Sequence, residues 1–340
     1  MFCFFRSVSI LLFFHSVLGN DFIQRFENWF RDFDIHYTND HKYLEMFDKW
    51  ISNDKFINDI NSQNLSYILA HNQFSGMDTN DFRNYIGSYK NIEILNNTMK
   101  YEINQEKSVE LQSLQSSINW VEKGAVTEIK NQGQCGSCWS FSTTGALEGA
   151  YFIKYGELIA FSEQQLVDCD NFKNGGRDFG CNGGLMDNAF KWISKNGGLC
   201  SEISYPYVSG ETTEAGVCTK TCSLVSNTNI KSYVDVIPSS DDEMMNALSK
   251  QPVAVAIQAN QRSFQLYKSG ILTDNCGTEL DHGVLLIGYG SLNNENYYII
   301  KNSWGKSWGM DGYIYIGRGS QYNNGDGQCG VLLQGSYPCL

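Results

Sequence analysis

One cysteine in this sequence stands where a side chain can act as a nucleophile. Cys138 follows a glycine- and serine-containing stretch and begins a run with helical character. A cysteine at a helix N-terminus lies at the positive end of the helix dipole, which stabilises the nucleophilic thiolate. The side-chain amide of Gln132 and the backbone N–H of Cys138 are two donors for a developing oxyanion. The sequence therefore predicts nucleophilic catalysis at Cys138.

Cys135 and Cys138 also form a C-x-x-C pair, which has two other interpretations. A thioredoxin-like redox pair usually accompanies a βαβ pattern, and the sequence lacks that pattern. A zinc site needs a second closely spaced ligand pair, and the spacing of Cys218 and Cys222 matches that requirement poorly. We therefore expect no metal and no cofactor.

A nucleophilic cysteine needs a base, and the histidine distribution leaves one choice. The chain has five His, of which only His282 lies beyond Ser113. If the apolar runs on either side of a turn centred near Leu292 pair as a hairpin, residue 282 lies opposite Asn302. Asn302 is then expected to orient the imidazole, and Trp304 to shield that hydrogen bond from water. A neutral Asn suits a pair that rests as thiolate and imidazolium.

Length, charge and cysteine usage limit the class of protein. The chain has 340 residues and a net charge of −12, which argues against a nucleic-acid partner. Residues 1–19 read as a signal peptide, because Arg6 precedes a short apolar run that ends in small residues. The alternative, a membrane anchor, is disfavoured because that run is too short to span a bilayer. We expect the secretory pathway, with a lysosomal, vacuolar or extracellular destination.

The cysteines divide the chain. Apart from Cys3, all of the 11 Cys fall between Cys135 and Cys339. We predict an inhibitory prosegment at 20–113 and a catalytic unit at 114–340; the alternative for 20–113 is a small helical domain of independent function. The prosegment carries 9 basic and 15 acidic residues, and the catalytic unit 15 and 22. Since both parts are acidic, docking must rest on aromatic burial and local pairs.

Hydrophobic periodicity predicts the elements that position these residues. Aromatic residues at helical spacing predict prosegment helices over 22–33 and 47–60. Helical runs are expected next at 138–151, 162–168 and 185–195, and strands later, at 253–257, 284–289 and 297–300. Helices followed by strands indicate an α+β unit in two lobes, with a site between them.

Four separated motifs resemble those of the papain and cathepsin L family of cysteine proteases. They are Gln132–Ser142, Cys181–Gly184, Asp281–Gly283 and Asn302–Gly305. The resemblance implies the papain-like two-lobed fold, a helical lobe plus a β-barrel-like lobe, and a cysteine endopeptidase made as an inactive precursor. Its partners would be protein and peptide substrates and its own prosegment, with the protein a monomer.

The resemblance also assigns the substrate-binding positions. Gly183 and Gly184 match the stretch whose backbone pairs with an extended substrate, and Gln334 matches the floor of the pocket for the residue two before the scissile bond. The other positions assigned to substrate binding are Leu185, Met186, Ala256, Leu280, Gly283 and Trp304. An apolar wall with a polar floor predicts a preference for Leu, Phe or Val.

Disulfides follow from the same resemblance. It implies the bridges Cys135–Cys181, Cys169–Cys218 and Cys276–Cys329. We expect a fourth bridge, Cys200–Cys222, because both residues flank the segment around Cys218. Cys339 would then be the odd thiol.

The prosegment follows the family pattern less closely. Asn53, Ile57, Asn61 and Asn72-x-Phe74 fit its signature, whereas the family has other residues where this chain has Lys42, Met46, Trp50 and Gly76. Asn64 and Asn96 are predicted glycosylation acceptors. Two rival functions remain at this stage: an inactive binding protein with the same fold, and a transferase that uses thioester chemistry.

Overall fold

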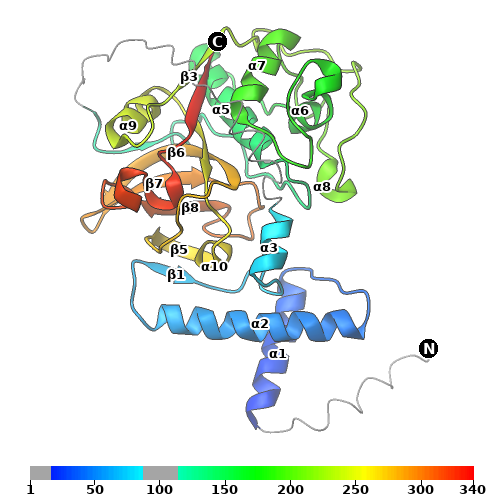
Figure 1. Ribbon diagram of the computed structural model, residues 1–340, viewed down its shortest axis with the longest axis vertical. Coiled ribbons are helices and arrows are strands. Elements are labelled where there is room, and N and C mark those ends of the chain that lie inside the picture. The colour runs from blue at the N-terminus through cyan, green and yellow to red at the C-terminus, as the bar shows by residue number, and fades with distance from the viewer. Residues whose placement is uncertain (1–16, 87–113) are drawn as a thin grey trace.

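The computed structural model describes residues 17–86 and 114–340. Most of the predicted signal peptide and the acceptor Asn96 lie outside this part. Figure 1 shows three regions: a pair of crossed helices, a group of helices, and a group of strands.

The predicted prosegment helices form α1, Val17–Asp32, and α2, Asp40–Asn61. Asn39 caps α2, because its side chain accepts a hydrogen bond from the Lys42 backbone N–H at 3.0 Å. The two helices cross (Figure 1). They bury an aromatic cluster of their own, formed by Phe26, Trp29, Phe30 and Trp50. The aromatic spacing in the sequence therefore encodes this helix pair.

The rest of the described prosegment joins the helix pair to the body of the protein. Strand β1, Tyr67–Leu69, pairs antiparallel with β5, Tyr267–Leu272, and so extends the sheet at its edge. Helix α3, Thr79–Tyr85, starts with a capping box between Asp78 and Asp81. In Figure 1, α3 stands between the crossed helices and the two lobes above them.

Helices form the first lobe of the body. They are α5, Cys138–Tyr155; α6, Glu163–Cys169; the short η2, Phe172–Asn174; α7, Met186–Asn196; and α8, Ser209–Thr212. The three helices expected here are confirmed. Helix α5 ends at Gly156, whose φ of 76° is a left-handed conformation that glycine adopts without steric cost.

Strands form the second lobe, in the order β1-β5-β8-β7-β6-β4-β9-β3, with β2 also paired to β6. The strands not yet named are β2, Ile118–Asn119; β3, Ser232–Asp235; β4, Val253–Ile257; β6, His282–Leu292; β7, Glu295–Lys301; β8, Tyr313–Gly317; and β9, Gly335–Cys339. Short helices connect them: α9, Asp241–Lys250; α10, Arg262–Gln265; η3, Asn323–Gly325; and η4, Gln328–Gly330. The two-residue β2 is too short to give a sequence signal.

The hairpin of β6 and β7 differs from the expected register. Its turn is Asn293–Asn294, both with positive φ, and Leu292 pairs with Glu295. A shift between Leu286 and Gly288 follows, and the last pair is Leu285 with Lys301. The prediction that residues 282 and 302 pair across the hairpin is therefore wrong, although their side chains still meet.

The two lobes share one hydrophobic core along α5 and β6. The Ser142 hydroxyl donates to the Val284 carbonyl oxygen at 2.6 Å. A Cβ on Gly145 would lie 2.8 Å from a methyl carbon of Leu285, so glycine allows α5 to approach the strand closely. The first residue of α5 and the first residue of β6 are thereby held at the junction of the lobes.

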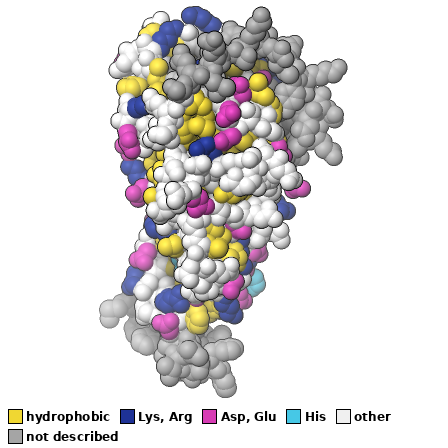
Figure 2. Space-filling view, turned by 90° about the vertical axis from the view of Figure 1, so that its left-hand side faces the viewer, with side chains coloured by type: hydrophobic (Ala, Val, Ile, Leu, Met, Phe, Trp, Pro, Cys, Tyr) yellow, Lys and Arg dark blue, Asp and Glu magenta, His cyan; other side chains and the backbone are white. Residues whose placement is uncertain are grey.

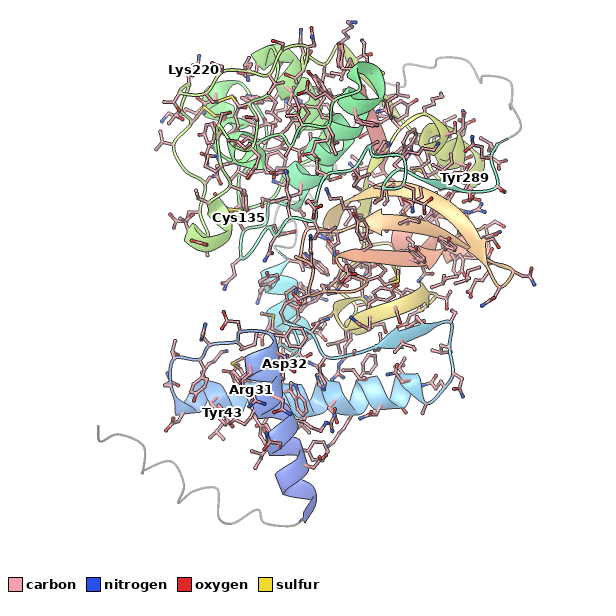
Figure 3. All side chains as sticks on the ribbon, turned by 180° about the vertical axis from the view of Figure 1, so that it is seen from behind. Arg31, Asp32, Tyr43, Cys135, Lys220 and Tyr289 are labelled. Carbon is pink, nitrogen blue, oxygen red and sulfur yellow. A yellow bond between two sulfur atoms is a disulfide. The ribbon has the colours of Figure 1, made fainter. Side chains whose placement is uncertain are left out.

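Four disulfides are formed in the body of the protein. They join Cys135 to Cys181, Cys169 to Cys218, Cys200 to Cys222, and Cys276 to Cys329. Among the cysteines that the structure describes, Cys138 and Cys339 are free. Figure 3 shows Cys135 on the helical lobe and Tyr289 on the strand lobe, with Tyr43 on the crossed helices below.

The prosegment docks mainly through backbone and amide hydrogen bonds and aromatic contacts. The Asn72 side-chain amide donates to the Gln265 carbonyl oxygen at 2.7 Å, and the Gln265 amide donates to the Phe74 carbonyl oxygen at 2.9 Å. Arg262 donates to the Asn53 side chain at 2.7 Å. On the face in Figure 2, acidic and basic side chains are interspersed over the length of the molecule.

Candidate active site

Cys138 is the first residue of α5 and is buried, 2% exposed. The side chain of its N-terminal neighbour Ser137 makes no capping hydrogen bond to the helix. The first backbone N–H groups of α5 are therefore not taken up by that side chain. The backbone N–H groups of Gly283, Trp139 and Cys138 itself act on the thiol and favour its ionised form. The site therefore joins the start of α5 to the start of β6.

His282 is held in one orientation by Asn302. The imidazole Nε2 lies 2.8 Å from the Asn302 Oδ1 atom. The Ser303 backbone N–H also donates to that atom, at 2.8 Å, which fixes it as the amide oxygen. Nε2 must then carry the proton and donate it, so Nδ1 is the basic nitrogen. Nδ1 is buried and has no hydrogen-bond partner. The imidazole thus has one nitrogen available to accept a proton.

The pair is electrostatically different from the ion pair expected from the sequence. Burial raises the pKa of the Cys138 thiol to about 11, despite the favourable N–H groups, and the Asp281 charge raises it further. Burial also lowers the pKa of His282 to about 4, although its bond to Asn302 acts in the opposite direction. The buried site in this structure therefore favours a neutral thiol and a neutral imidazole.

Gln132 links the nucleophile loop to the segment after β7. Its side-chain amide nitrogen donates to the Cys135 carbonyl oxygen at 3.0 Å, and its amide oxygen accepts from the Ser303 hydroxyl at 2.7 Å. Its backbone N–H donates to the Ser303 carbonyl oxygen at 2.8 Å. One amide proton is thus used within the loop, and the second remains for another acceptor.

The glycine segment before α7 is tightly supported. Gly183 has a φ of 106°, and its carbonyl oxygen accepts from the Phe179 backbone N–H at 2.9 Å. A Cβ on Gly184 would lie 2.5 Å from the Trp139 ring, so this backbone lies flat against the residue that follows the nucleophile. Leu185 and Met186 continue the segment and are buried.

The other predicted pocket residues come from the strand lobe. Ala256 and Gly283 are register partners on β4 and β6, and the Ala256 N–H donates to the Gln334 carbonyl oxygen at 3.0 Å. The Gln334 side-chain nitrogen is buried and has no partner. Leu280 is half-buried, and its side chain lies beside Gly330.

Trp304 packs between the site and the prosegment. Its indole stacks on the His282 ring at 4.7 Å and 26°, which supports its expected shielding role. It also meets Phe74 at 5.5 Å and Phe82 at 5.4 Å, both edge-on. Trp304 is 0% exposed with the prosegment packed on it, so its predicted contact with substrate would require removal of the prosegment.

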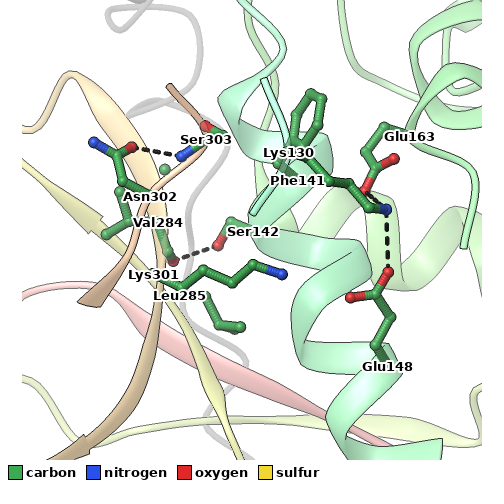
Figure 4. Close-up of a pocket in the computed structure, with 11 residues that line it drawn as sticks. Lys130, Phe141, Ser142, Glu148, Glu163, Val284, Leu285, Lys301, Asn302 and Ser303 are labelled. Atoms are coloured by element: carbon green, nitrogen blue, oxygen red, sulfur yellow. Dashed lines mark hydrogen bonds and ion pairs between the residues drawn. The ribbon is translucent and has the colours of Figure 1, made fainter. Parts of the chain in front are cut away.

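A small cavity lies behind the site, between α5 and the β6–β7 hairpin (Figure 4). Its wall includes Lys130, which donates to Glu163 at 2.6 Å and to Glu148 at 3.2 Å. Burial raises the pKa of Glu163 to about 8 and lowers that of Lys301 to about 8. Buried ionisable side chains line this cavity. It is therefore a polar region of the protein interior beneath the site, and we do not assign it as the peptide-binding cleft.

The sequence did not reveal the residues that support the site residues through hydrogen bonds. Ser303 supports both Asn302 and Gln132, and its position inside the Asn302–Gly305 motif was the available signal. Gln73 of the prosegment donates to the Trp304 carbonyl oxygen at 2.8 Å and gave no signal in sequence. Asp281, whose pKa burial raises to about 7, accepts from the Ala259 N–H at 2.7 Å.

Within 17–86 and 114–340, no group of three His, Cys, Asp or Glu side chains is arranged to hold a metal ion. No helix in this same part of the chain has the length and apolar character needed to cross a membrane.

Two family models match this chain. Residues 114–339 match the papain family of cysteine proteases, and residues 26–82 match the cathepsin propeptide inhibitor domain. The second match covers α2, β1, most of α3 and part of α1.

This chain is similar in sequence to curated relatives and in fold to solved structures. A probable cysteine protease, RD21B of Arabidopsis thaliana, is 42% identical over 86% of this chain; the match spans only 60% of that protein's own length. The senescence-specific cysteine protease SAG39 of Oryza sativa subsp. indica is 38% identical over 92% of this chain and 89% of its own length. The proform of the ragweed pollen cysteine protease Amb a 11 superimposes with a TM-score of 0.83, at 33% identity, over 99% of both chains.

Proposed function

This chain belongs to the papain family of cysteine proteases, and we propose that it is the precursor of a cysteine endopeptidase that Cys138 and His282 operate. The observation that carries the proposal is the orientation of His282. Asn302 and the Ser303 N–H fix its tautomer, and its basic Nδ1 is left unpaired at the lobe junction where α5 presents the thiol.

In the proposed mechanism, His282 Nδ1 takes the thiol proton and the sulfur attacks the carbonyl carbon of the scissile peptide. The electron pair moves to the carbonyl oxygen, where the second Gln132 amide proton and the Cys138 N–H stabilise it. The imidazolium then protonates the departing amine, which leaves a thioester on Cys138. Water, deprotonated by His282, hydrolyses the thioester and restores the thiol.

We assign residues 20–113 as the inhibitory prosegment, with residues 114–340 as the catalytic part. The match to a propeptide inhibitor domain and the docking contacts of Asn72 and Phe74 support this division. Burial disfavours both charged forms of the Cys138–His282 pair in the precursor. Release of the prosegment would hydrate the site and bring the two pKa values toward the ion pair that attack requires.

The pocket residues support a preference for an apolar side chain two residues before the scissile bond. Leu185, Met186 and Ala256 are apolar, and Gln334 adds one polar group near β4. A peptide library varied at that position tests the proposal. Leu, Phe or Val is expected to be selected, and selection of acidic side chains would contradict it.

The decisive experiment is acidification of the purified precursor with a reducing agent. Self-processing near Leu114 is expected for the wild type, and Cys138→Ala is expected to abolish it. A thiol-reactive peptide epoxide should label the processed wild type only. If neither processing nor labelling occurs, a binding protein with the same fold is the better description. Transfer of an acyl group to amines without net hydrolysis would favour the transferase.

We also propose passage through the secretory pathway and a monomeric protein. The four disulfides fit an oxidising compartment. Asn64 is exposed at the turn between α2 and β1, where a glycan would be accommodated. Intact-mass measurement before and after glycosidase treatment tests occupancy of the acceptor.

A further inference from the structure

Two carboxyl groups lie buried beneath the glycine segment that the proposed function assigns to substrate pairing. Asp170 ends α6, and Asp178 lies eight residues later, before the Cys181–Gly184 motif. Asp170 is 0% exposed and Asp178 is 1% exposed. The Asp178 backbone N–H donates to the Asp170 carbonyl oxygen at 3.1 Å, which holds the two residues together.

Asp178 supports the substrate segment directly. Its Oδ1 accepts from the Leu185 backbone N–H and from the Asn188 side-chain amide, each at 3.0 Å. Leu185 is the N-cap of α7 and makes no side-chain cap bond, so Asp178 supplies an acceptor at the start of that helix. A Cβ on Gly184 would lie 2.8 Å from the Asp178 carboxyl carbon, which shows how closely the segment rests on this side chain.

One oxygen of each of the two carboxyl groups has no hydrogen-bond donor among the described residues. Each Oδ2 is buried and receives no N–H or O–H from any described group, and the two carboxyl side chains are near enough to act on each other's pKa through a hydrogen bond. Two carboxylates cannot bond to each other unless one of them carries a proton. A buried dianion without a donor between its oxygens would also be strongly disfavoured.

In the part of the chain that the structure describes, no neighbouring positive charge is placed to stabilise both carboxyl groups in their ionised forms without a proton between them. Lys195 of α7 acts on Asp170 from a distance, and the Arg177 backbone N–H donates to Asp170 Oδ1 at 3.1 Å. On the α5 side the pair faces the uncharged Trp139 across Gly184. Burial raises the pKa of both carboxyl groups, and the Asp170 charge raises that of Asp178 further.

We propose that Asp170 and Asp178 share one proton and that this pair positions Gly183–Leu185 for substrate, so that loss of the proton at alkaline pH loosens the segment and weakens substrate binding. The two aspartates are positioning residues, since they act through the backbone of the segment. The proposal rests on the proposed function for the role of the segment, but the shared proton does not.

Asp178→Asn tests the proton itself. The amide oxygen can still accept from Leu185 and Asn188, and the amide nitrogen donates permanently to Asp170, as the protonated acid does. In the processed wild type, KM for a peptide with an apolar side chain at the pocket position should rise about threefold or more toward alkaline pH, the scale of one net hydrogen bond, with a smaller effect on kcat. Asp178→Asn should abolish that rise.

Two further variants distinguish the effect of the shared proton from the effect of the hydrogen bond that Asp178 accepts from Leu185. Asp178→Ala removes the acceptor for Leu185 and should raise KM at every pH, a defect that Asn rescues. Asp187→Asn is the matched control, because Asp187 is a carboxyl on α7 whose pKa burial also raises but which bonds to Ser336 instead. It should keep the wild-type pH dependence. A wild-type KM that does not rise with pH, or equal pH profiles of KM for wild type and Asp178→Asn, would overturn the proposal.

A measurement without catalysis keeps this test independent of the proposed function. In a Cys138→Ala precursor, raised carboxyl pKa values mean that stability is present at low pH and lost as pH rises through them. The thermal midpoint should therefore fall toward alkaline pH, and Asp178→Asn should reduce that fall. If no variant cleaves peptides, the proposed function fails while this comparison still decides whether the proton is shared; identical slopes would refute the sharing.

Discussion

The indole of Trp304 stacks on the imidazole of His282 at 4.7 Å and 26°, and its edges meet aromatic side chains of the prosegment. One residue thus contacts both the base of the proposed catalytic pair and the segment proposed to inhibit it. Prosegment docking and protection of the His282–Asn302 bond are consequently coupled through a single side chain.

Phe74→Ala is expected to weaken prosegment docking. The ring is buried against Trp304, and truncating a buried Phe costs about 3–5 kcal/mol. The variant precursor should process itself faster and at higher pH than the wild type, as followed by gel electrophoresis over time. Ile68→Ala is the control, because Ile68 lies on β1 but is 53% exposed. Equal processing rates for wild type and Phe74→Ala would argue against this docking contact.

Asn302→Ala is expected to lower kcat of the processed enzyme by about 10²-fold, with little change in KM. Without the Oδ1 acceptor, His282 Nε2 loses the bond that fixes its tautomer. Steady-state kinetics on a peptide substrate provide the measurement. Ser303→Ala is the comparison: it removes the hydroxyl bond to Gln132 but keeps the backbone N–H to Asn302, so its loss should be smaller. A normal kcat for Asn302→Ala would contradict the orienting role.

His71 is expected to destabilise the precursor on acidification. Burial lowers its pKa, its Nε2 lies 3.0 Å from Asp54, and its ring stacks on Trp50 at 4.2 Å. A lowered histidine pKa means that stability is present above about pH 6.5 and lost as pH falls through the folded-state pKa. Arg25, which also binds Asp54, adds to the penalty for a charged imidazole.

Thermal unfolding of Cys138→Ala precursors between about pH 7 and pH 4 checks this effect, at about 1.4 kcal/mol per unit of pKa difference. His71→Gln should make the midpoint less dependent on pH, even if its value at neutral pH is lower. His36→Gln should keep the wild-type slope, because the His36 side chain is 85% exposed. A wild-type slope in His71→Gln would exclude His71 as a contributor.

Removal of the Cys200–Cys222 bridge is expected to destabilise the protein by about 3 kcal/mol, as loop-closure entropy predicts for a separation of 22 residues. The double variant with both cysteines changed to Ala tests this in urea unfolding of the precursor. Cys339→Ser is the matched control, because that thiol is free. An unchanged unfolding midpoint for the double variant would show that the bridge contributes nothing to stability.

Local signals in the sequence were sufficient for much of this protein. The position of Cys138 at a helix start, the solitary His282 of the catalytic part, and the aromatic spacing of α1 and α2 all follow from short stretches of residues. Helix and strand periodicities are local properties, so they can be recognised before any tertiary contact is known.

Tertiary structure decided what depends on packing. The turn at Asn293–Asn294 set the hairpin register, the irregularity between Leu286 and Gly288 changed it by one residue, and the side chains of His282 and Asn302 met beyond the last ladder pair. Burial disfavours the charged forms of both Cys138 and His282 in the precursor, because desolvation opposes the local effect of the helix start and depends on everything packed around the site. The Asp170–Asp178 contact likewise appears only when the chain folds back on itself. The residue types and their spacing in the sequence determined which side chains can react. Their burial in the folded protein determined which protonation states are favoured.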